Sequence, residues 1–564
     1  MPELREDIAA LLLDRLGDER LGLRTRHQDW TWDEVVRESA ARGAYAAELR
    51  ADGPFHIGVL LDNVPDFIFW LGGAALSGAT IVGINPTRGN DELAGEVRHA
   101  DCQLIVTDSA GRERLSGLDL GLTPDRILVV DDPAYQDAIC ARKSAASAEN
   151  RAQITAADGV DDQSLLLLLF TSGTTGASKA VKCSQGRLAW IAYSAVDKFN
   201  HVRGDVDYCC MPLFHGNAIM ALWAPALAVG ATVCLTPSFS ASGFLPDVRY
   251  FGATFFTYVG KALGYLLATP EQPDDADNQL GRGFGTEASP EDQAYFKRRF
   301  GADLYEGYGS SEGGGAVVLD PDQPEGALGR PAHPGVAIVN PETMIECVPA
   351  VLDQHGRLLN PDDAVGEIVD KLGTKKFEGY YKNDAADADR IRNGWYWTGD
   401  LGYVDANGFI YFAGRRGDWI RVDGENTSAL SIERVLRRHP EVIAAGVYAV
   451  PDSRSGDQVM AAIEVADPIL FDVDTFVKYL NDQDDLGKKG TPRFLRISDS
   501  LPVTGSNKVL KRELQADKWH TEELVYRWVG RPVGNSVPVF QLMTEDAKRA
   551  LDDEFTQYGR QRYL

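Results

Sequence analysis

The sequence has 564 residues, of which 44% are hydrophobic and 25% are charged. This composition is typical of soluble globular proteins, and it excludes a fibrous or globally disordered chain. The formal net charge of −26 argues against a nucleic-acid-binding or membrane-surface protein, because so acidic a surface repels phosphates and anionic lipid headgroups. The length predicts two or more domains.

The cysteines and the first residues of the chain indicate the cellular compartment in which the protein is expected. Seven cysteines, an odd number with no Cys-x-x-Cys pair, predict reduced thiols. Acidic residues stand at positions 3, 6 and 7, where a secretory signal would be basic and then apolar. The longest apolar run, 218–224, is much shorter than the ~20 residues that a membrane span needs. We therefore expect a cytoplasmic protein without a transmembrane segment.

Strand-like runs alternate with helical patterns through the first two-thirds of the chain. One helix candidate spans 66–75, and the buried strands expected around it are 56–61, 80–84, 103–107 and 126–130. Short β-rich runs separated by helical patterns predict an α/β fold with mostly parallel sheets covered by helices.

The pattern changes beyond about residue 413. A short charged stretch with glycines is followed by a helix candidate at 431–438 and a strand-like run at 444–450. We therefore expect a large N-terminal domain of residues 1–415 and a smaller α+β C-terminal domain of residues 416–564.

The strongest local signal is a loop rich in glycines and hydroxyls that follows the apolar run 165–170. Glycines let the backbone approach a ligand closely, hydroxyls add hydrogen-bond donors, and a lysine adds a positive charge. The loop is not a Walker motif, because its lysine comes three residues after the last glycine. The residues expected to hold a polyphosphate are Thr171, Ser172, Gly173, Thr174, Thr175, Gly176 and Lys179.

The pattern TSGTTGxxK after an apolar strand resembles the phosphate loop of the adenylate-forming superfamily, which comprises acyl-CoA synthetases, adenylation domains of peptide synthetases and luciferases. Further segments resemble this family's motifs in the family's order: YEGYGSSE at 305–312, WYWTGDLG at 395–402, GRRGD at 414–418 and LPVTGSNKVLK at 501–511. The resemblance implies ATP-dependent activation of a carboxylic acid to acyl-AMP with Mg²⁺, followed by transfer to CoA.

The resemblance also implies roles for single residues on the nucleotide. Tyr308 would stack on adenine, Asp400 would accept hydrogen bonds from the ribose hydroxyls, and Glu312 with Thr171 would hold Mg²⁺. Ser311 stands where the family usually has threonine, which keeps the hydroxyl. Further residues expected at the ATP site are Gly285, Thr286, Gly309 and Ser311.

Three residues are expected to be catalytic: Lys508, Arg415 and Glu312. Lys508 matches the family's catalytic lysine, and Arg415 matches the arginine on ribose and phosphate. In the family the C-terminal domain rotates about a hinge between the two half-reactions. Here the usual Asp or Lys of the hinge is replaced by Gly417, and the pivot would be Gly417, Asp418 or both. The CoA tunnel would be lined by Gly424 and Glu425.

The acyl pocket is expected near the segment PLFHG at 212–216, which resembles the family's aromatic-gate region. A core histidine with satisfied hydrogen bonds is the alternative interpretation of its histidine. Small residues would leave the pocket roomy, although a glycine can equally be required by a turn. The residues expected to line the pocket are His215, Gly216, Gly309 and Gly313.

Several features favour the branch of fatty-acid transport proteins and very-long-chain or bulky-acid acyl-CoA synthetases: YVGK at 258–261, the R-x-G-D hinge and GEN at 424–426. The expected substrate is a long-chain acid or a polycyclic one such as a steroid or terpenoid acid. CoA is favoured as acceptor, since no phosphopantetheine-type serine motif follows Lys508. A charged helix candidate at 545–549 would pack on its own domain or on the second subunit of a homodimer.

Four alternatives stay open. The acceptor could be a separate carrier protein, the chain could be a nucleotide-binding relative without turnover, or it could be an oxidative luciferase-like enzyme. The letters GSSEG at 309–313 also fit the Gly-x-Ser-x-Gly elbow of a hydrolase. However, this match lies inside the adenine motif and no HGGG-type oxyanion segment accompanies it. No cluster of His, Cys and Asp has the spacing of a zinc site.

Overall fold

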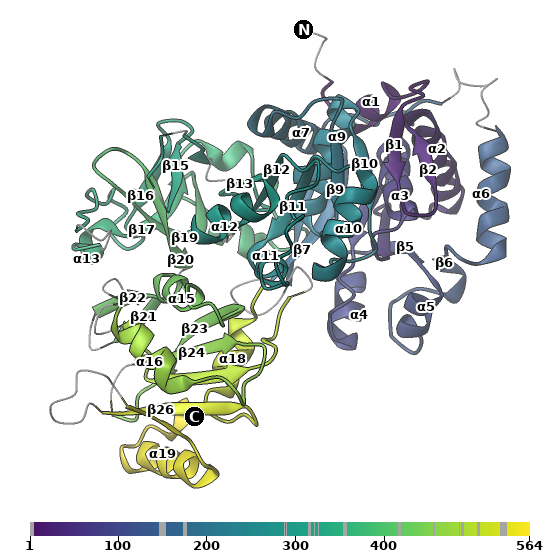
Figure 1. Cartoon of the computed structure of the whole chain (residues 1–564). Coiled ribbons are helices and arrows are strands. Elements are labelled where there is room, and N and C mark those ends of the chain that lie inside the picture. Colours follow the sequence, from purple (N-terminus) through teal and green to yellow (C-terminus); the bar gives the residue numbers. More distant parts are fainter. Residues whose placement is uncertain are drawn as a thin grey trace.

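Figure 1 shows a computed structural model of the chain, with a large N-terminal part drawn purple to teal and green, and a smaller C-terminal part drawn green to yellow. The structure describes residues 5–145, 154–172, 178–286, 288, 290–313, 317–320, 322–324, 326–353, 358–415, 419–422, 425–454, 457–483, 486, 490–504, 508–530 and 539–564.

The first sheet has the strand order β6-β5-β3-β4-β7-β8. All neighbouring strands are parallel except β7 and β8, which form an antiparallel pair. Its strands are β3 (His56–Leu60), β4 (Thr80–Gly83), β5 (Cys102–Thr107), β6 (Ile127–Val129), β7 (Leu165–Ser172) and β8 (Ser178–Ser184). The helices of this region are α1 (Ile8–Leu13), α2 (Trp32–Leu49), α3 (Pro65–Ser77), α4 (Asn90–His99), α5 (Ser109–Leu115), η1 (Pro124–Arg126) and α6 (Pro133–Ala145).

The second sheet has the order β13-β12-β11-β9-β10-β1-β2 and is parallel except at β2. Its strands are β1 (Leu21–Arg24), β2 (Asp29–Thr31), β9 (Val206–Cys209), β10 (Thr232–Leu235), β11 (Phe255–Val259), β12 (Arg282–Thr286) and β13 (Asp303–Glu306). The helices of this region are α7 (Gln185–Phe199), α8 (Gly216–Ala218), η3 (Ile219–Trp223), α9 (Ala224–Val229), α10 (Ala241–Phe251), α11 (Gly260–Leu267) and α12 (Pro290–Phe300).

Local chemistry sets the ends of these helices. A reciprocal capping box of Thr31 and Glu34 starts α2. Pro65 occupies the first turn of α3, where its missing N–H costs nothing, and Gly78 ends this helix in the left-handed conformation at φ 72°. The hydroxyl of Ser184 accepts the N–H of Arg187 at the start of α7.

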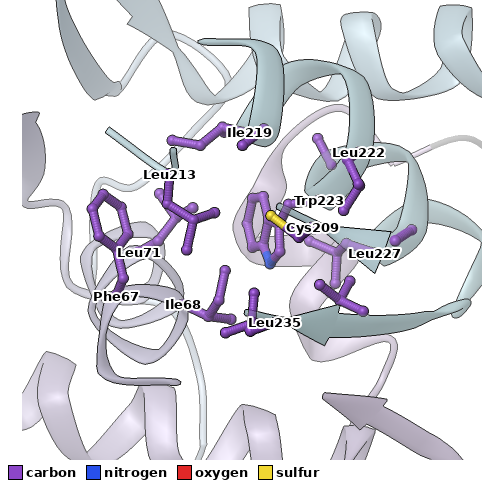
Figure 2. Close-up of a cluster of buried hydrophobic side chains, with 14 of the residues drawn as sticks. Phe67, Ile68, Leu71, Cys209, Leu213, Ile219, Leu222, Trp223, Leu227 and Leu235 are labelled. Carbon is purple, nitrogen blue, oxygen red and sulfur yellow. The ribbon is translucent and has the colours of Figure 1, made fainter. Parts of the chain in front are cut away.

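The main core lies between the two parallel sheets. Figure 2 shows Phe67, Ile68 and Leu71 of α3 in one buried cluster with residues of the second sheet and its helices, including Trp223, Leu227 and Leu235. These side chains are almost completely buried. Truncation of one large buried side chain to alanine costs about 2–5 kcal/mol, so this core fixes the relative position of the two sheets.

A third sheet is antiparallel and was not expected from the sequence. Its order is β14-β15-β20-β19-β17-β16, with β18 paired to β19. Its strands are β14 (Val317–Val318), β15 (Ala327–Pro331), β16 (Val336–Val339), β17 (Gly366–Asp370), β18 (Ile391–Arg392), β19 (Trp395–Val404) and β20 (Ile410–Arg415). The short helices beside it are α13 (Pro361–Ala364), η4 (Gly373–Lys375) and α14 (Asp384–Arg390).

The smaller domain contains the hairpin β21 (Trp419–Val422) and β22 (Glu425–Ser428), and a mixed sheet of order β23-β24-β25-β26-β27. The sheet strands are β23 (Ala444–Pro451), β24 (Asp457–Glu464), β25 (Phe494–Ser498), β26 (Leu524–Gly530) and β27 (Val539–Leu542). Its helices are α15 (Ala429–Arg437), α16 (Val473–Asn481), α18 (Lys511–Asp517), α19 (Glu545–Gln557) and η5 (Gln561–Tyr563).

The predicted fold class is confirmed: a large α/β domain with mostly parallel sheets precedes a smaller α+β domain. The helix expected in the tail is α19, and it packs on its own domain. Trp519 Nε1 donates to Asp552 at 3.0 Å, and Leu551 and Phe555 join the same buried cluster. The domain boundary at 415/416 stays a prediction, because residues 416–418 are outside the described ranges.

Candidate active site

The expected phosphate loop connects the antiparallel strands β7 and β8. Backbone pairing places Thr171 opposite Lys179 and Ser172 opposite Ser178. Buried leucines anchor β7 in the first sheet, so the strand fixes where the loop leaves and where Lys179 returns. The remaining residues expected on phosphate lie outside the described residues: Gly173, Thr174, Thr175 and Gly176. For Ser172 only the backbone is described.

Glu312 and Lys179 meet at one tyrosine that the sequence analysis did not select. The hydroxyl of Tyr380 donates to Glu312 Oε1 at 2.9 Å, and Arg390 Nε donates to the same hydroxyl at 3.1 Å. Lys179 Nζ lies 5.3 Å from the centroid of the Tyr380 ring. Burial, and after it the charge of Glu312, raises the pKa of Tyr380, so the phenol stays neutral and donates to the carboxylate.

The adenine and ribose motifs are joined by a second tyrosine–carboxylate hydrogen bond. The hydroxyl of Tyr308 donates to Asp400 Oδ2 at 2.9 Å. Asp400 is positioned by Thr398, whose hydroxyl oxygen accepts the N–H of Asp400 at 3.1 Å. Burial, and after it the charge of Asp400, raises the pKa of Tyr308 well above its usual value. Asp400 also stands opposite Arg415 in the β19–β20 pairing, which places the backbones of both predicted nucleotide residues together.

Gly285 and Thr286 form the end of β12, beside the adenine motif. Gly285 pairs with Glu306 of β13. A Cβ atom on Gly285 would lie 2.5 Å from ring atoms of Tyr258, so no larger residue fits there. The Tyr258 hydroxyl in turn donates to Glu306 Oε1 at 2.5 Å. Close packing of β11, β12 and β13 therefore brings the two segments to one edge of the second sheet.

The four residues expected at the acyl pocket differ in what surrounds them. A Cβ on Gly216 would lie 3.3 Å from Ser311 Oγ, so the gate segment touches the adenine motif. A Cβ on Gly309 would meet nothing within 4 Å. Gly313 has φ +88° and a Cβ there would lie 2.5 Å from Arg187 Nη2. The structure therefore favours the turn requirement at Gly313, while Gly309 has open space beside it.

His215 lies near the predicted catalytic lysine, which comes from the other domain. Burial, and after it the positive charge of Lys508, lowers the pKa of His215 to about 4. The imidazole is therefore neutral at pH 7, and its Nδ1 accepts the N–H of Asn217 at 3.4 Å. Lys508 is fixed in its own loop, because Thr504 accepts its N–H through Oγ1 at 3.0 Å and donates its N–H to the Lys508 carbonyl at 2.7 Å.

Other predicted positions are only partly described. Gly417, Asp418 and Gly424 lie outside the described residues, and for Arg415 and Glu425 only the backbone is described.

Within the described ranges, no group of three or more His, Cys, Asp or Glu side chains could hold a metal ion. Nor does any helix in those ranges have the length and apolarity needed to cross a membrane. The seven cysteines, all in described positions, are free thiols, as predicted.

Tyr380 and Arg390 are the neighbours of Glu312 that sequence reasoning missed. Tyr380 lies 68 residues after Glu312, and no spacing in FEGYY at 377–381 points back to that carboxylate. A bridge with Val181 holds Tyr380 against β8 of the first sheet, while α14 carries Arg390 beside β18 and β19 of the third sheet, so contacts between distant segments bring them together.

Comparison with known proteins agrees with this geometry. The chain matches the family "AMP-binding enzyme" over residues 14–381 and "AMP-binding enzyme C-terminal domain" over residues 431–508. It is 68% identical over 560 residues to the steroid-22-oyl-CoA synthetase of Rhodococcus jostii, covering 99% of both chains. It is 44% identical over 506 residues to the medium/long-chain-fatty-acid–CoA ligase FadD17 of Mycobacterium marinum, covering 90% of this chain and 94% of that one.

Solved structures share the fold. ATP-bound MatB from Rhodopseudomonas palustris has a TM-score of 0.74 at 22% identity, over 91% of this chain and 98% of that one. The expected resemblance to acyl-CoA synthetases of the adenylate-forming superfamily is confirmed by the two family matches and by the named relatives. The chain belongs to the AMP-binding enzyme family.

Proposed function

We propose that the chain converts a steroid-derived carboxylic acid into its CoA thioester, with ATP cleaved to AMP and pyrophosphate. The observation that carries the proposal is the 68% identity, over 99% of both chains, to the R. jostii steroid-22-oyl-CoA synthetase. The position of Lys508 near His215, and of Lys179 and Glu312 at Tyr380, supports the same chemistry. A cytoplasmic location is part of the proposal, since the seven cysteines are free thiols.

The proposed reaction has two steps. A carboxylate oxygen of the acid attacks the α-phosphorus of ATP, and pyrophosphate leaves. The sulfur of CoA then attacks the acyl carbon, and AMP leaves. The first step requires charge neutralisation and in-line positioning more than proton transfer. We assign this work to two lysines: Lys179 would neutralise the β/γ-phosphates, and Lys508 would bridge the carboxylate and the α-phosphate.

The nucleotide would be held by the residues on and beside the third sheet. Asp400 would accept the ribose hydroxyls while Tyr308 orients it, and Arg415 would contact ribose and phosphate. Glu312 and Thr171 offer oxygen ligands of the kind that Mg²⁺ prefers, and the Glu312 carboxylate has lone pairs beyond the one that accepts Tyr380. Bound Mg²⁺ would neutralise phosphate charge. Gly417 and Asp418 would form the hinge, and Gly424 and Glu425 would line the CoA tunnel.

A medium- or long-chain fatty acid is the second candidate substrate, because FadD17 of M. marinum is 44% identical over 90% of this chain. A polycyclic acid needs a wide pocket, whereas a fatty acid needs a narrow, long one. Gly309 has open space beside it, so the two candidate acids differ in how much they need the absence of a side chain at this position.

Acid-dependent ATP–pyrophosphate exchange, measured with a steroid side-chain acid and with fatty acids, tests the proposal. We expect exchange with the steroid acid and AMP release that depends on CoA. Exchange with fatty acids alone would replace the first candidate by the second. Exchange without CoA-dependent AMP release would point to a carrier-protein acceptor. ATP binding without exchange for any acid would point to a relative without turnover.

A further inference from the structure

A buried ion pair joins the two domains. Lys261, on α11 of the large domain, lies with its Nζ 2.9 Å from Oε2 of Glu464, at the end of β24 in the smaller domain. Both side chains are only 3% exposed. Figure 1 shows α11 at the side of the large domain that faces the smaller one.

The pair also holds the backbone of a third residue. Lys261 Nζ donates to the carbonyl of Leu501 at 3.0 Å, and Glu464 Oε2 accepts the N–H of Leu501 at 2.9 Å. Both polar groups of Leu501 are therefore bound by the two charges. Lysine and glutamate are rarely buried unless they are paired, and here each satisfies the other and a backbone group.

Leu501 begins the segment that carries Lys508. The N–H of Leu510 donates to the Pro502 carbonyl at 2.8 Å, and Val503 forms a bridge with Val509. These contacts make a closed loop, with Leu501 at its base and Lys508 on the returning arm. The position of Leu501 therefore sets where the backbone of Lys508 lies.

Residues of α11 next to Lys261 also contact the smaller domain. Lys261, Gly264 and Tyr265 share one helix face, being three and four residues apart. A Cβ atom on Gly264 would lie 2.8 Å from the carbonyl oxygen of Ile443, so the helix backbone approaches the smaller domain closely. Burial, and after it the Glu464 carboxylate, raises the pKa of Tyr265, and Lys261 Nζ lies 5.2 Å from the centroid of the Tyr265 ring.

We infer that Lys261 and Glu464 form an interdomain latch, in which they act as positioning residues that stabilise the domain arrangement with Lys508 at the site of acyl-AMP formation. The inference rests on the proposed function. Rotation of the smaller domain would have to separate the two charges and return both to water. The latch therefore favours the first half-reaction and has to open for the second.

The variants Lys261→Met and Glu464→Gln keep side-chain size while removing one charge. Asp275→Asn is the matched control, since Asp275 pairs with Arg299 at 2.5 Å, the side chains are 5% and 3% exposed, and both residues belong to the large domain. Two rates are measured for each protein: acid-dependent ATP–pyrophosphate exchange, and thioester formation from synthetic acyl-AMP and CoA.

We expect each latch variant to lower the exchange rate by about tenfold or more, with acyl transfer within about twofold of the unaltered chain, because only the first step needs the latched arrangement. Asp275→Asn should keep the ratio of the two rates. The double variant Lys261→Met/Glu464→Leu, which leaves no unpaired charge, should show the same split. Equal loss in both half-reactions, or no loss in either, would overturn the latch.

Small-angle X-ray scattering gives a readout that does not need turnover. The latch variants should broaden the distribution of interatomic distances, and Asp275→Asn should not. Absence of exchange in the unaltered chain would count against the proposed function, whereas the scattering result would still decide the latch: identical profiles for all variants would contradict it.

Discussion

The hydroxyl of Tyr308 donates a hydrogen bond to Oδ2 of Asp400 at 2.9 Å, across 92 residues of sequence. The residue expected on adenine thus orients the residue expected on ribose. Burial raises the pKa of Tyr308 well above its usual value, so this phenol stays protonated and donates at neutral pH.

Asp400→Asn should weaken ATP binding more than Tyr308→Phe does. The first change replaces the carboxylate that we propose to accept the two ribose hydroxyls, whereas the second removes one orienting hydrogen bond and keeps the ring. We expect the KM for ATP to rise about 10–100-fold for Asp400→Asn and less than about tenfold for Tyr308→Phe. Equal effects of the two changes on KM would contradict the assigned order of contacts.

Tyr380→Phe should raise the Mg²⁺ concentration needed for half-maximal exchange. The phenol hydroxyl that positions Glu312 Oε1 is lost, while the ring near Lys179 stays. We expect a rise of about 3–10-fold, and a larger one for Glu312→Gln, which removes a charge that would face the metal. A Mg²⁺ titration of the exchange rate measures both. Unchanged Mg²⁺ dependence in Glu312→Gln would remove Glu312 from the metal site.

The sequence predicted more of the parallel part of the fold than of the antiparallel part. The strands expected at 56–61 and 103–107 correspond to β3 and β5, because fully buried parallel strands appear as continuous apolar runs. Strand β19 has neither a continuous buried run nor a regular alternation, and it contains Thr398, Gly399 and Asp400, which look like a turn in isolation. Its pairing with β17 and β20 depends on residues far along the chain.

The candidate active site shows the same difference between features that are local in sequence and features that depend on distant residues. Motif residues such as Lys508 could be selected because their family pattern is local in sequence. Tyr380 could not be selected, since its role comes from one hydrogen bond to Glu312. The pairing of Lys261 with Glu464 was equally hidden, because a lysine and a glutamate are usually on the surface and this pair forms between two domains.

Lys508→Ala should abolish most acyl-AMP formation and spare acyl transfer. The loop that carries Lys508 is held by backbone contacts with Thr504, so alanine should keep the loop's shape while it removes the charge near His215. We expect exchange to fall by about 100-fold or more, with thioester formation from synthetic acyl-AMP within about threefold. Equal loss in both half-reactions would refute the assigned role.

Gly313→Ala should lower stability through backbone strain, whereas Gly309→Ala should change the choice of substrate through the size of the pocket. At Gly313, φ is +88° and the new Cβ would lie 2.5 Å from Arg187 Nη2, so we expect a loss of about 1–3 kcal/mol in unfolding free energy. A Cβ on Gly309 would meet nothing within 4 Å, so stability should change little. Gly309→Ala should instead lower kcat/KM for a polycyclic acid more than for a fatty acid. Denaturant unfolding and a two-substrate comparison measure the two effects, and equal stability losses would contradict the distinction.

His215 should make stability depend on pH between its ordinary and its folded pKa. Burial and Lys508 lower the pKa from 6.5 to about 4, so the unfolded chain binds a proton in this window that the folded chain does not. Unfolding free energy therefore rises with pH there, and it falls as pH drops from 6.5 toward 4. Other groups also titrate, so the difference between the unaltered chain and His215→Gln isolates this residue. Denaturant unfolding at several pH values should show a steeper decline in the unaltered chain. Parallel curves for the two proteins would mean that His215 is protonated equally in the folded and unfolded states, and would contradict the effect of burial on its imidazole.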